Sequence, residues 1–250
     1  MSHAHKIKDF NTRAPKSMDK NDTKKEIEAL QERMPELQRL MGAQGKHSLL
    51  IVLQGMDASG KDGASSSILQ GFTSGDVEIE SFKKPTEEEF AHDFLWRVHE
   101  VVPQKGGITI FNRSHYEDVL IQRVHNWIDE DRVKQRFEHI NNFEQLLAQE
   151  NGTTILKFFL NVSFDKQEER LTERKEILRK MHKHNDGDWE ERKHWSKYME
   201  AYEDVFANCG PEIPWIIVPT DQNWMKEYTL IKTIVDTMEG WGMEYPGAED

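Results

Sequence analysis

The chain has 250 residues, of which 36% are apolar and 31% are charged, and its formal net charge at pH 7 is −12. This length allows one domain with a substantial core, and no apolar run approaches the roughly 18–20 residues of a membrane-spanning helix. The acidic balance argues against general binding to nucleic acid or to a membrane surface, so a polyanionic ligand would have to meet a local basic patch. We expect a cytoplasmic protein, because the chain has a single cysteine, Cys209, and its N-terminal residues lack the apolar segment of a secretory signal.

The first 22 residues are polar and irregular, and we expect them to form an N-terminal arm, with a neighbouring subunit as its candidate partner. Residues 23–250 are expected to form a single domain, because strands and helices alternate along them without an internal repeat. Apolar residues at helical spacing predict a helix over Thr23–Met41. The apolar run that follows predicts a strand over Ser48–Leu53.

A glycine-rich loop follows this strand directly, and the stretch from Gly55 to Lys61 matches the pattern G-x-x-x-x-G-K. Small residues after it predict a helix start, so the loop joins a strand to a helix N-terminus, as in the phosphate cradle of P-loop proteins. Glycines let backbone amides turn inward, the helix end adds about half a positive charge, and the lysine adds a full one. We therefore predict a catalytic role for Lys61 and phosphate contacts from Gly55, Met56, Ala58, Ser59, Gly60, Asp62 and Gly63.

Two carboxylates belong to this segment. Asp57 lies inside the loop, and Asp62 stands where P-loops usually have a Ser or Thr ligand to Mg²⁺. Because carboxylates also bind Mg²⁺, we expect both to be metal ligands, with Asp57 also in a catalytic role. The alternatives are a loop-stabilising hydrogen-bond acceptor for Asp57 and a helix-stabilising acid in the first turn for Asp62.

Further candidates follow the next strands. Alternation predicts a strand over Asp76–Phe82, and Thr86 with Glu89 resembles a capping box that opens a helix continuing to Val98. Ile108–Phe111 predicts another strand, and ligands of open α/β sheets collect at the C-terminal ends of strands. The polar residues at this end and in the helix expected over 118–127 are therefore site candidates: Asn112 and Arg123 for phosphate, Arg113 and Glu117 for catalysis, and Asp118 for Mg²⁺. The alternative for Asp118 is pairing with Gln122 or Arg123 on the helix surface.

The remaining pattern predicts helices over 132–149, 165–180, 189–206 and 224–241 and strands over 153–162 and 214–218. Strands that alternate with helices imply a parallel sheet covered on both faces. Basic residues concentrate between Arg170 and Lys183, in an acidic protein and near an interruption between two helices. We expect a lid at about 170–189 that closes over phosphates with Arg170, Arg174, Lys180 and Lys183. A solvated helix face is the alternative.

The chain resembles polyphosphate kinase family 2, in the subclass that accepts both nucleoside mono- and diphosphates. The resemblance rests on five segments: LLIVLQGMDASGKDG (49–63), SFKKPTEEEFAHDFLWRVHEVVP (81–103), IFNRSHYEDVLIQRVH (110–125), NNFEQLLAQENGTTILKFFLNVS (141–163) and PWIIVPTDQNW (214–224). It implies a P-loop kinase-like α/β/α sandwich with a helical lid, usually assembled as a homodimer or homotetramer. Its phosphate-binding motifs map onto Gly55–Lys61 and onto Asn112 and Arg113.

Two departures from the family pattern stand out. Many relatives have Asp at the position of Asn112, and close relatives have Trp-Lys-Phe where this chain has His182-Lys183-His184. We expect Mg²⁺-dependent, reversible phosphoryl transfer from polyphosphate to AMP and ADP, with guanine nucleotides as alternative acceptors. In-line transfer to a phosphate needs positioning and charge neutralisation more than a base. The rival hypotheses are an ATP-dependent nucleoside monophosphate kinase and a non-catalytic protein that binds polyphosphate or nucleotides.

Overall fold

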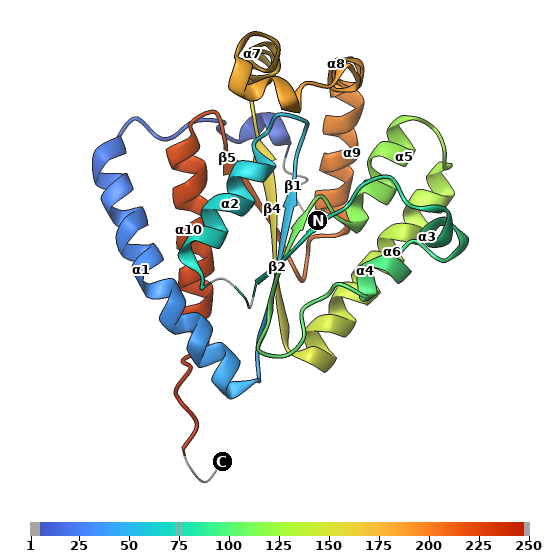
Figure 1. The fold of residues 1–250 in the computed structure, drawn as a ribbon. Helices are drawn as coiled ribbons and strands as arrows, with labels where there is room; N and C mark the ends of the chain where they lie inside the picture. Colours follow the sequence, from blue (N-terminus) through green and yellow to red (C-terminus); the bar gives the residue numbers. More distant parts are fainter. Residues whose placement is uncertain (1–5, 74, 76, 248–250) are drawn as a thin grey trace.

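The computed structural model describes residues 6–73, 75 and 77–247. Within them, a single parallel sheet has the strand order β2-β3-β1-β4-β5 (Figure 1). Its strands are β1 (Ser48–Gln54), β2 (Val77–Ser81), β3 (Ile108–Asn112), β4 (Thr153–Asn161) and β5 (Trp215–Pro219). The predicted parallel sheet is therefore confirmed, and the strand that carries the glycine-rich loop is its central one.

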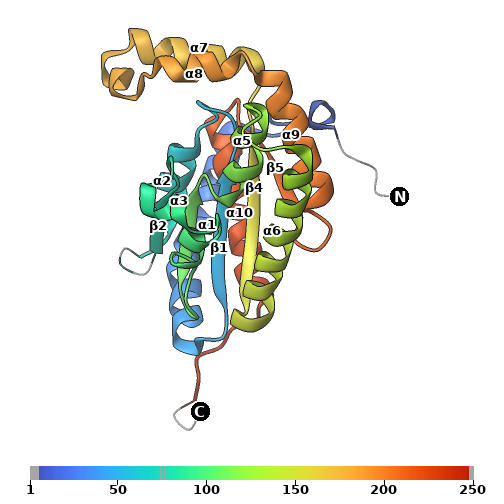
Figure 2. The same cartoon turned by 90° about the vertical axis from the view of Figure 1, so that its right-hand side faces the viewer.

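Helices cover both faces of the sheet, which makes the expected three-layer sandwich (Figures 1 and 2). One face is covered by α1 (Lys20–Gln44), α2 (Lys61–Gly71) and α10 (Asn223–Gly240), and the other by α4 (Trp96–His99), α5 (Ile121–Val124), α6 (Glu130–Asn151) and α9 (Trp195–Asn208). The short α3 (Glu87–Ala91) follows β2. Above the ends of the strands project α7 (Phe164–Glu176) and α8 (Asp186–Arg192), and the 3-10 helices are Ile7–Asp9, His115–Val119 and Leu178–Lys183.

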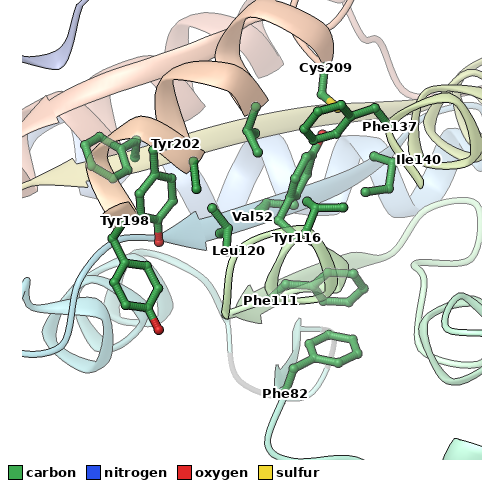
Figure 3. Packing of buried hydrophobic residues seen from close by; sticks show 14 of the residues in the cluster. Val52, Phe82, Phe111, Tyr116, Leu120, Phe137, Ile140, Tyr198, Tyr202 and Cys209 are labelled. Atoms are coloured by element: carbon green, nitrogen blue, oxygen red, sulfur yellow. The ribbon is translucent and has the colours of Figure 1, made fainter. Parts of the chain in front are cut away.

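The core lies on the two sides of β1, all of whose residues are buried. Leu49 and Ile51 belong to the apolar cluster under α1, α2 and α10, whereas Leu50 and Val52 belong to the cluster under α6 and α9. Figure 3 shows the second cluster, in which Val52 packs among aromatic residues from helices and from β3. A strand buried on both faces is held firmly, so the loop at its end has a fixed base.

Several helices are shorter than the sequence pattern predicts. The capping box of Thr86 and Glu89 is present, but the helix it opens ends at Ala91, and the Asp93 side chain accepts from the amide of Leu95 before α4 begins. The helix predicted over 165–180 ends at Glu176, where the extended Ile177 leads into a 3-10 helix. The helix predicted over 189–206 is divided between α8 and α9.

The N-terminal segment packs on its own chain. Ile7 is buried, and its amide donates to Glu203 at 2.9 Å. Thr12 donates to Asp221 at 2.9 Å, and the amide of Ala14 donates to Gln222 at 2.8 Å. The start of the arm therefore packs on α9 and its later part on the turn between β5 and α10, where the sequence suggested a neighbouring subunit. Among the described residues, no helix is long and apolar enough to cross a membrane.

Candidate active site

The glycine-rich loop has two positions, Gly55 and Gly60, whose backbone conformation favours glycine. Gly55 has a φ of 154°, and a Cβ there would lie 2.8 Å from Ser59 Oγ and 2.9 Å from the carbonyl oxygen of Leu160. Gly60, with a φ of 104°, precedes α2 and offers no side-chain cap. The N-terminal amides of α2 are thus left for a ligand, and an anion is the ligand that a helix N-terminus favours.

Lys61 is folded into the loop that precedes it. Its Nζ donates to the carbonyl oxygens of Gly55 at 2.7 Å and Met56 at 3.1 Å, and its side chain is buried. Burial, with the positive charge of Arg113 nearby, lowers the pKa of Lys61 to about 8. No carboxylate within ion-pair distance neutralises this ammonium among the described residues, so an incoming phosphate can take that place.

Arg113 joins the end of β3 to the loop. It has a φ of 63°, in the left-handed region, and its amide donates to the carbonyl oxygen of Leu53 at 3.1 Å. Its guanidinium contacts Asp57 on one side and lies 3.5 Å from Glu117 on the other. Burial alone would raise the pKa of Asp57, but Arg113 and Lys61 outweigh it and hold that pKa below its usual range. The two carboxylates therefore orient a fixed cation beside the P-loop.

Asp62 joins the start of α2 to the lid. Its carboxylate accepts from Lys183 Nζ at 2.9 Å and from Asn112 Nδ2 at 3.1 Å. Lys183 belongs to the 3-10 helix between α7 and α8, and Figure 2 shows these helices reaching over the edge of the sheet where the strands end. The basic segment thus lies above the P-loop, as the lid prediction requires.

A cleft of about 780 Å³ lies between the P-loop and the lid. Most of the predicted site residues line it: Asp57, Ala58, Gly60, Lys61, Asp62, Gly63, Asn112, Arg113, Arg170, Arg174, Lys180 and Lys183. Ten basic and five acidic side chains line the cleft among the described residues. A protein with a net charge of −12 therefore has a cleft in which cations predominate, which suits a phosphate-rich ligand.

The lid cations differ in what holds them. Arg170 donates to the carbonyl oxygens of Ala58 at 3.0 Å and Ser59 at 2.9 Å, so it holds this part of the P-loop in place. Arg174 pairs with Asp188 at 2.6 Å. Lys180 pairs with Glu173, which lies on α7. Arg174 and Lys180 must exchange these partners to reach a phosphate, whereas Arg170 shapes the loop where it stands.

The structure does not bring Asp118 or Arg123 to the cleft. Asp118 is buried beside Gln122, with Arg97 and Arg136 each 3.8 Å away; burial, opposed by these arginines, raises its pKa to about 6. Arg123 forms ion pairs with Glu130 and Asp204, outside the cleft. The structure therefore places neither side chain in the cleft, and the 3-10 helix His115–Val119 stands where the predicted helix would begin.

Several lining residues escaped the sequence analysis. The rule that ligands gather at strand ends could have found Lys83, which follows β2, and Lys226, in the first turn of the helix after β5. Asp188 carried no such signal, because its position depends on how the lid folds back. Arg179, which also lines the cleft, belongs to the basic segment that the sequence places in the lid. The other lining residues that were not expected are Ser81, Phe82, Lys166, Glu173, Asn185, Asp221 and Asn223.

The parallel sheet, the lysine-bearing loop on its central strand and the basic lid define a P-loop kinase. The family model of Polyphosphate kinase 2 (PPK2) matches residues 17–245, so the chain belongs to that family, and the resemblance seen in the sequence is confirmed. An AMP/ADP-polyphosphate phosphotransferase from Meiothermus ruber is 46% identical over 224 residues, which cover 89% of this chain and 84% of the relative.

Two further relatives agree. An ADP-polyphosphate phosphotransferase from Rhodopseudomonas palustris is 39% identical over 228 residues, which cover 86% of this chain and 78% of the relative. The crystal structure of polyphosphate kinase 2 from Arthrobacter aurescens TC1 matches with a TM-score of 0.95 at 36% identity, covering 100% of this chain and 90% of that one. The match therefore includes the lid as well as the sheet.

Proposed function

We propose that this protein transfers phosphoryl groups reversibly between inorganic polyphosphate and adenine nucleotides, forming ADP from AMP and ATP from ADP. The observation that carries the proposal is the cleft in which Lys61 and Arg113 meet beneath a basic lid. Membership of the polyphosphate kinase 2 family supports the donor, and the Meiothermus ruber relative, named for both AMP and ADP, supports the acceptors.

The residues of the cleft suit a reaction that needs positioning more than proton transfer. The acceptor is a phosphate that is already anionic, so no strong base is required. The main requirement is to stabilise the charge that develops in the transition state. Lys61 and the amides at the start of α2 hold the phosphoryl group. Arg113, oriented by Asp57 and Glu117, neutralises the oxygens that gain charge during transfer.

We propose that Mg²⁺ is held by Asp57 and Asp62, one inside the loop and one just after it. The donor set fits this ion, because Mg²⁺ usually takes one or two carboxylates and completes its octahedron with water and substrate phosphates. Within the described part of the chain, no group of three or more acidic, histidine or cysteine side chains forms a complete protein cage, so substrate oxygens would have to supply the remaining ligands. When bound, Mg²⁺ would neutralise phosphate charge.

Two further parts of the proposal rest on the family resemblance: the protein assembles as a homodimer or homotetramer, and it accepts adenine nucleotides, with guanine nucleotides as alternative acceptors. The proposed cytoplasmic location rests instead on the lone Cys209. We also expect that the protein does not bind nucleic acid, because the basic residues of the site are concentrated in one cleft and do not form a broad face.

The acceptor range can be tested by product analysis with pure protein, Mg²⁺, long-chain polyphosphate and either AMP or ADP. We expect ADP followed by ATP from AMP, ATP from ADP, and no product after chelation with EDTA. Formation of ATP from ADP without any product from AMP would overturn the dual acceptor range. Unchanged rates in EDTA would overturn the metal assignment.

A further inference from the structure

Lys226 is a buried cation that the proposed mechanism does not use. It lies in the first turn of α10 with 2% of its surface exposed, yet its side chain lines the cleft. Its Nζ makes one hydrogen bond among the described residues, to the carbonyl oxygen of Gly60 at 3.3 Å. No described carboxylate lies within ion-pair distance of it. Burying a charge without a paired anion is costly, so a ligand anion would stabilise this arrangement.

The ammonium of Lys226 lies directly against the start of α2. A Cβ added to Gly60 would lie 3.3 Å from Nζ, and one added to Gly63 would lie 3.2 Å from it. Any larger residue at either position would crowd the lysine. The cation and the N-terminal amides of α2 therefore share one small space beside the P-loop, and both favour an anion.

The acidic side chains on this side of the cleft are held by hydrogen bonds or ion pairs within the protein. Asp221 accepts from the amide of Ser163 and from Thr12, each at 2.9 Å. Glu173 pairs with Lys180. Burial, opposed by the carboxylate of Glu227, lowers the pKa of Lys226 to about 8, which again reflects a cation without a close partner. Among the described residues on this side, Asp221 has no cation within ion-pair distance, but Arg170 and Lys226 also lack a paired carboxylate and outnumber it, so the balance of charge is positive.

We propose that Lys226 binds a phosphate group of the polyphosphate chain that is not transferred, in a subsite between α7 and α10 beside the P-loop. This inference rests on the proposed function. We assign the subsite to polyphosphate because a nucleoside needs an aromatic or apolar surface against which its base can pack. Among the described lining residues, the one aromatic side chain is Phe82, which follows β2 at the opposite edge of the sheet from β5. Lys166 and Arg170, on α7, extend the basic path on the side of Lys226.

The test compares Lys226→Met with a matched control, Lys232→Met, on the same helix. The side chain of Lys232 is partly exposed and pairs with Asp236 at 3.0 Å, and it does not line the cleft. For Lys226→Met, we expect the KM for long-chain polyphosphate to rise about tenfold, which is the loss of one charge-assisted hydrogen bond. The KM values for AMP and ADP should stay within twofold of the wild type. Lys226→Arg should recover part of the loss, and Lys232→Met should show none.

A direct binding measurement keeps this inference separate from the proposed function. Titration of long-chain polyphosphate into the protein without nucleotide should give about tenfold weaker binding for Lys226→Met, with a melting temperature close to that of the wild type. Equal polyphosphate affinity in the two proteins would overturn the subsite, as would a raised KM for AMP or ADP with an unchanged KM for polyphosphate. If the wild type binds polyphosphate but transfers nothing from it, the proposed function fails, and the titration still decides the role of Lys226.

Discussion

Replacing Lys61 by methionine is expected to lower kcat for polyphosphate-dependent phosphorylation by about 100-fold to 1,000-fold, the usual loss when one preorganised charge-stabilising donor is removed. The physical reason lies in its position. The ammonium is buried inside the loop, held by the carbonyl oxygens of Gly55 and Met56, and therefore needs little reorganisation to meet a phosphoryl oxygen. Methionine keeps an unbranched side chain, one heavy atom shorter, and removes the charge. Initial rates at saturating AMP and polyphosphate would measure the effect.

A surface lysine provides the control for this experiment. Lys134 lies on α6, its side chain is 72% exposed, and it pairs with Asp131 in the preceding turn, so Lys134→Met should leave the rate unchanged. Circular dichroism and melting temperature would show whether Lys61→Met is folded. A folded Lys61→Met protein with more than a tenth of the wild-type kcat would contradict the role we assign to this lysine.

The second large effect concerns stability and a lysine in the middle of the core. Lys157 lies on β4 with 1% of its side chain exposed, and its Nζ donates to Glu144 at 2.7 Å, to Tyr116 at 2.9 Å and to the carbonyl oxygen of Cys209 at 2.7 Å. The hydroxyl of Tyr116 also donates to Glu144, at 2.8 Å. Burial would raise the pKa of Glu144, but His115 and Lys157 outweigh it and lower that pKa. Figure 3 shows Tyr116 and Cys209 within the surrounding apolar cluster.

Lys157→Met is therefore expected to destabilise the protein by about 3–5 kcal/mol, because it removes the cation that pairs with the buried carboxylate of Glu144. For a chain of this size, the melting temperature should fall by about 6–20 °C. The double variant Lys157→Met/Glu144→Leu should recover more than half of the loss, since no buried charge remains. Chemical denaturation of the wild type and the variants would measure the free energies of unfolding.

The double variant also makes the prediction falsifiable. If Lys157→Met lost less than 1 kcal/mol, the ion pair would contribute little to the fold. If the double variant were no more stable than Lys157→Met, the loss would come from packing rather than from the unpaired charge. Either result would contradict the stabilising role that we assign to the pair of Lys157 and Glu144.

The phosphate-binding loop was predictable because its interactions are local. The carbonyl oxygens that hold Lys61 belong to Gly55 and Met56, a few positions earlier in the chain, and the strand before the loop and the helix after it follow from simple periodicity. Asn112 and Arg113 were found by a topological rule, since the ends of neighbouring parallel strands meet at one edge of the sheet. The capping box of Thr86 and Glu89 is local in the same sense.

The sequence did not reveal features that depend on distant partners. The role of Asp118 is decided by Arg97 and Arg136, which reach it from two other segments. Lys157 lies within an otherwise apolar strand pattern, and no neighbouring residue in the sequence indicates that it pairs with Glu144 on α6. Lys226 approaches the P-loop from the last helix of the chain. In each case, tertiary packing sets the environment of the charge.

The central claim is that polyphosphate is the phosphoryl donor, and a donor exchange tests it most directly. Purified protein would be incubated with AMP and Mg²⁺, with either long-chain polyphosphate or ATP as the only donor, and the products would be separated by ion-exchange chromatography. We predict that ADP forms with polyphosphate in the absence of any nucleoside triphosphate and that this product is lost in Lys61→Met. Formation of ADP with ATP alone, and none with polyphosphate, would contradict the proposed function and indicate an ATP-dependent nucleoside monophosphate kinase.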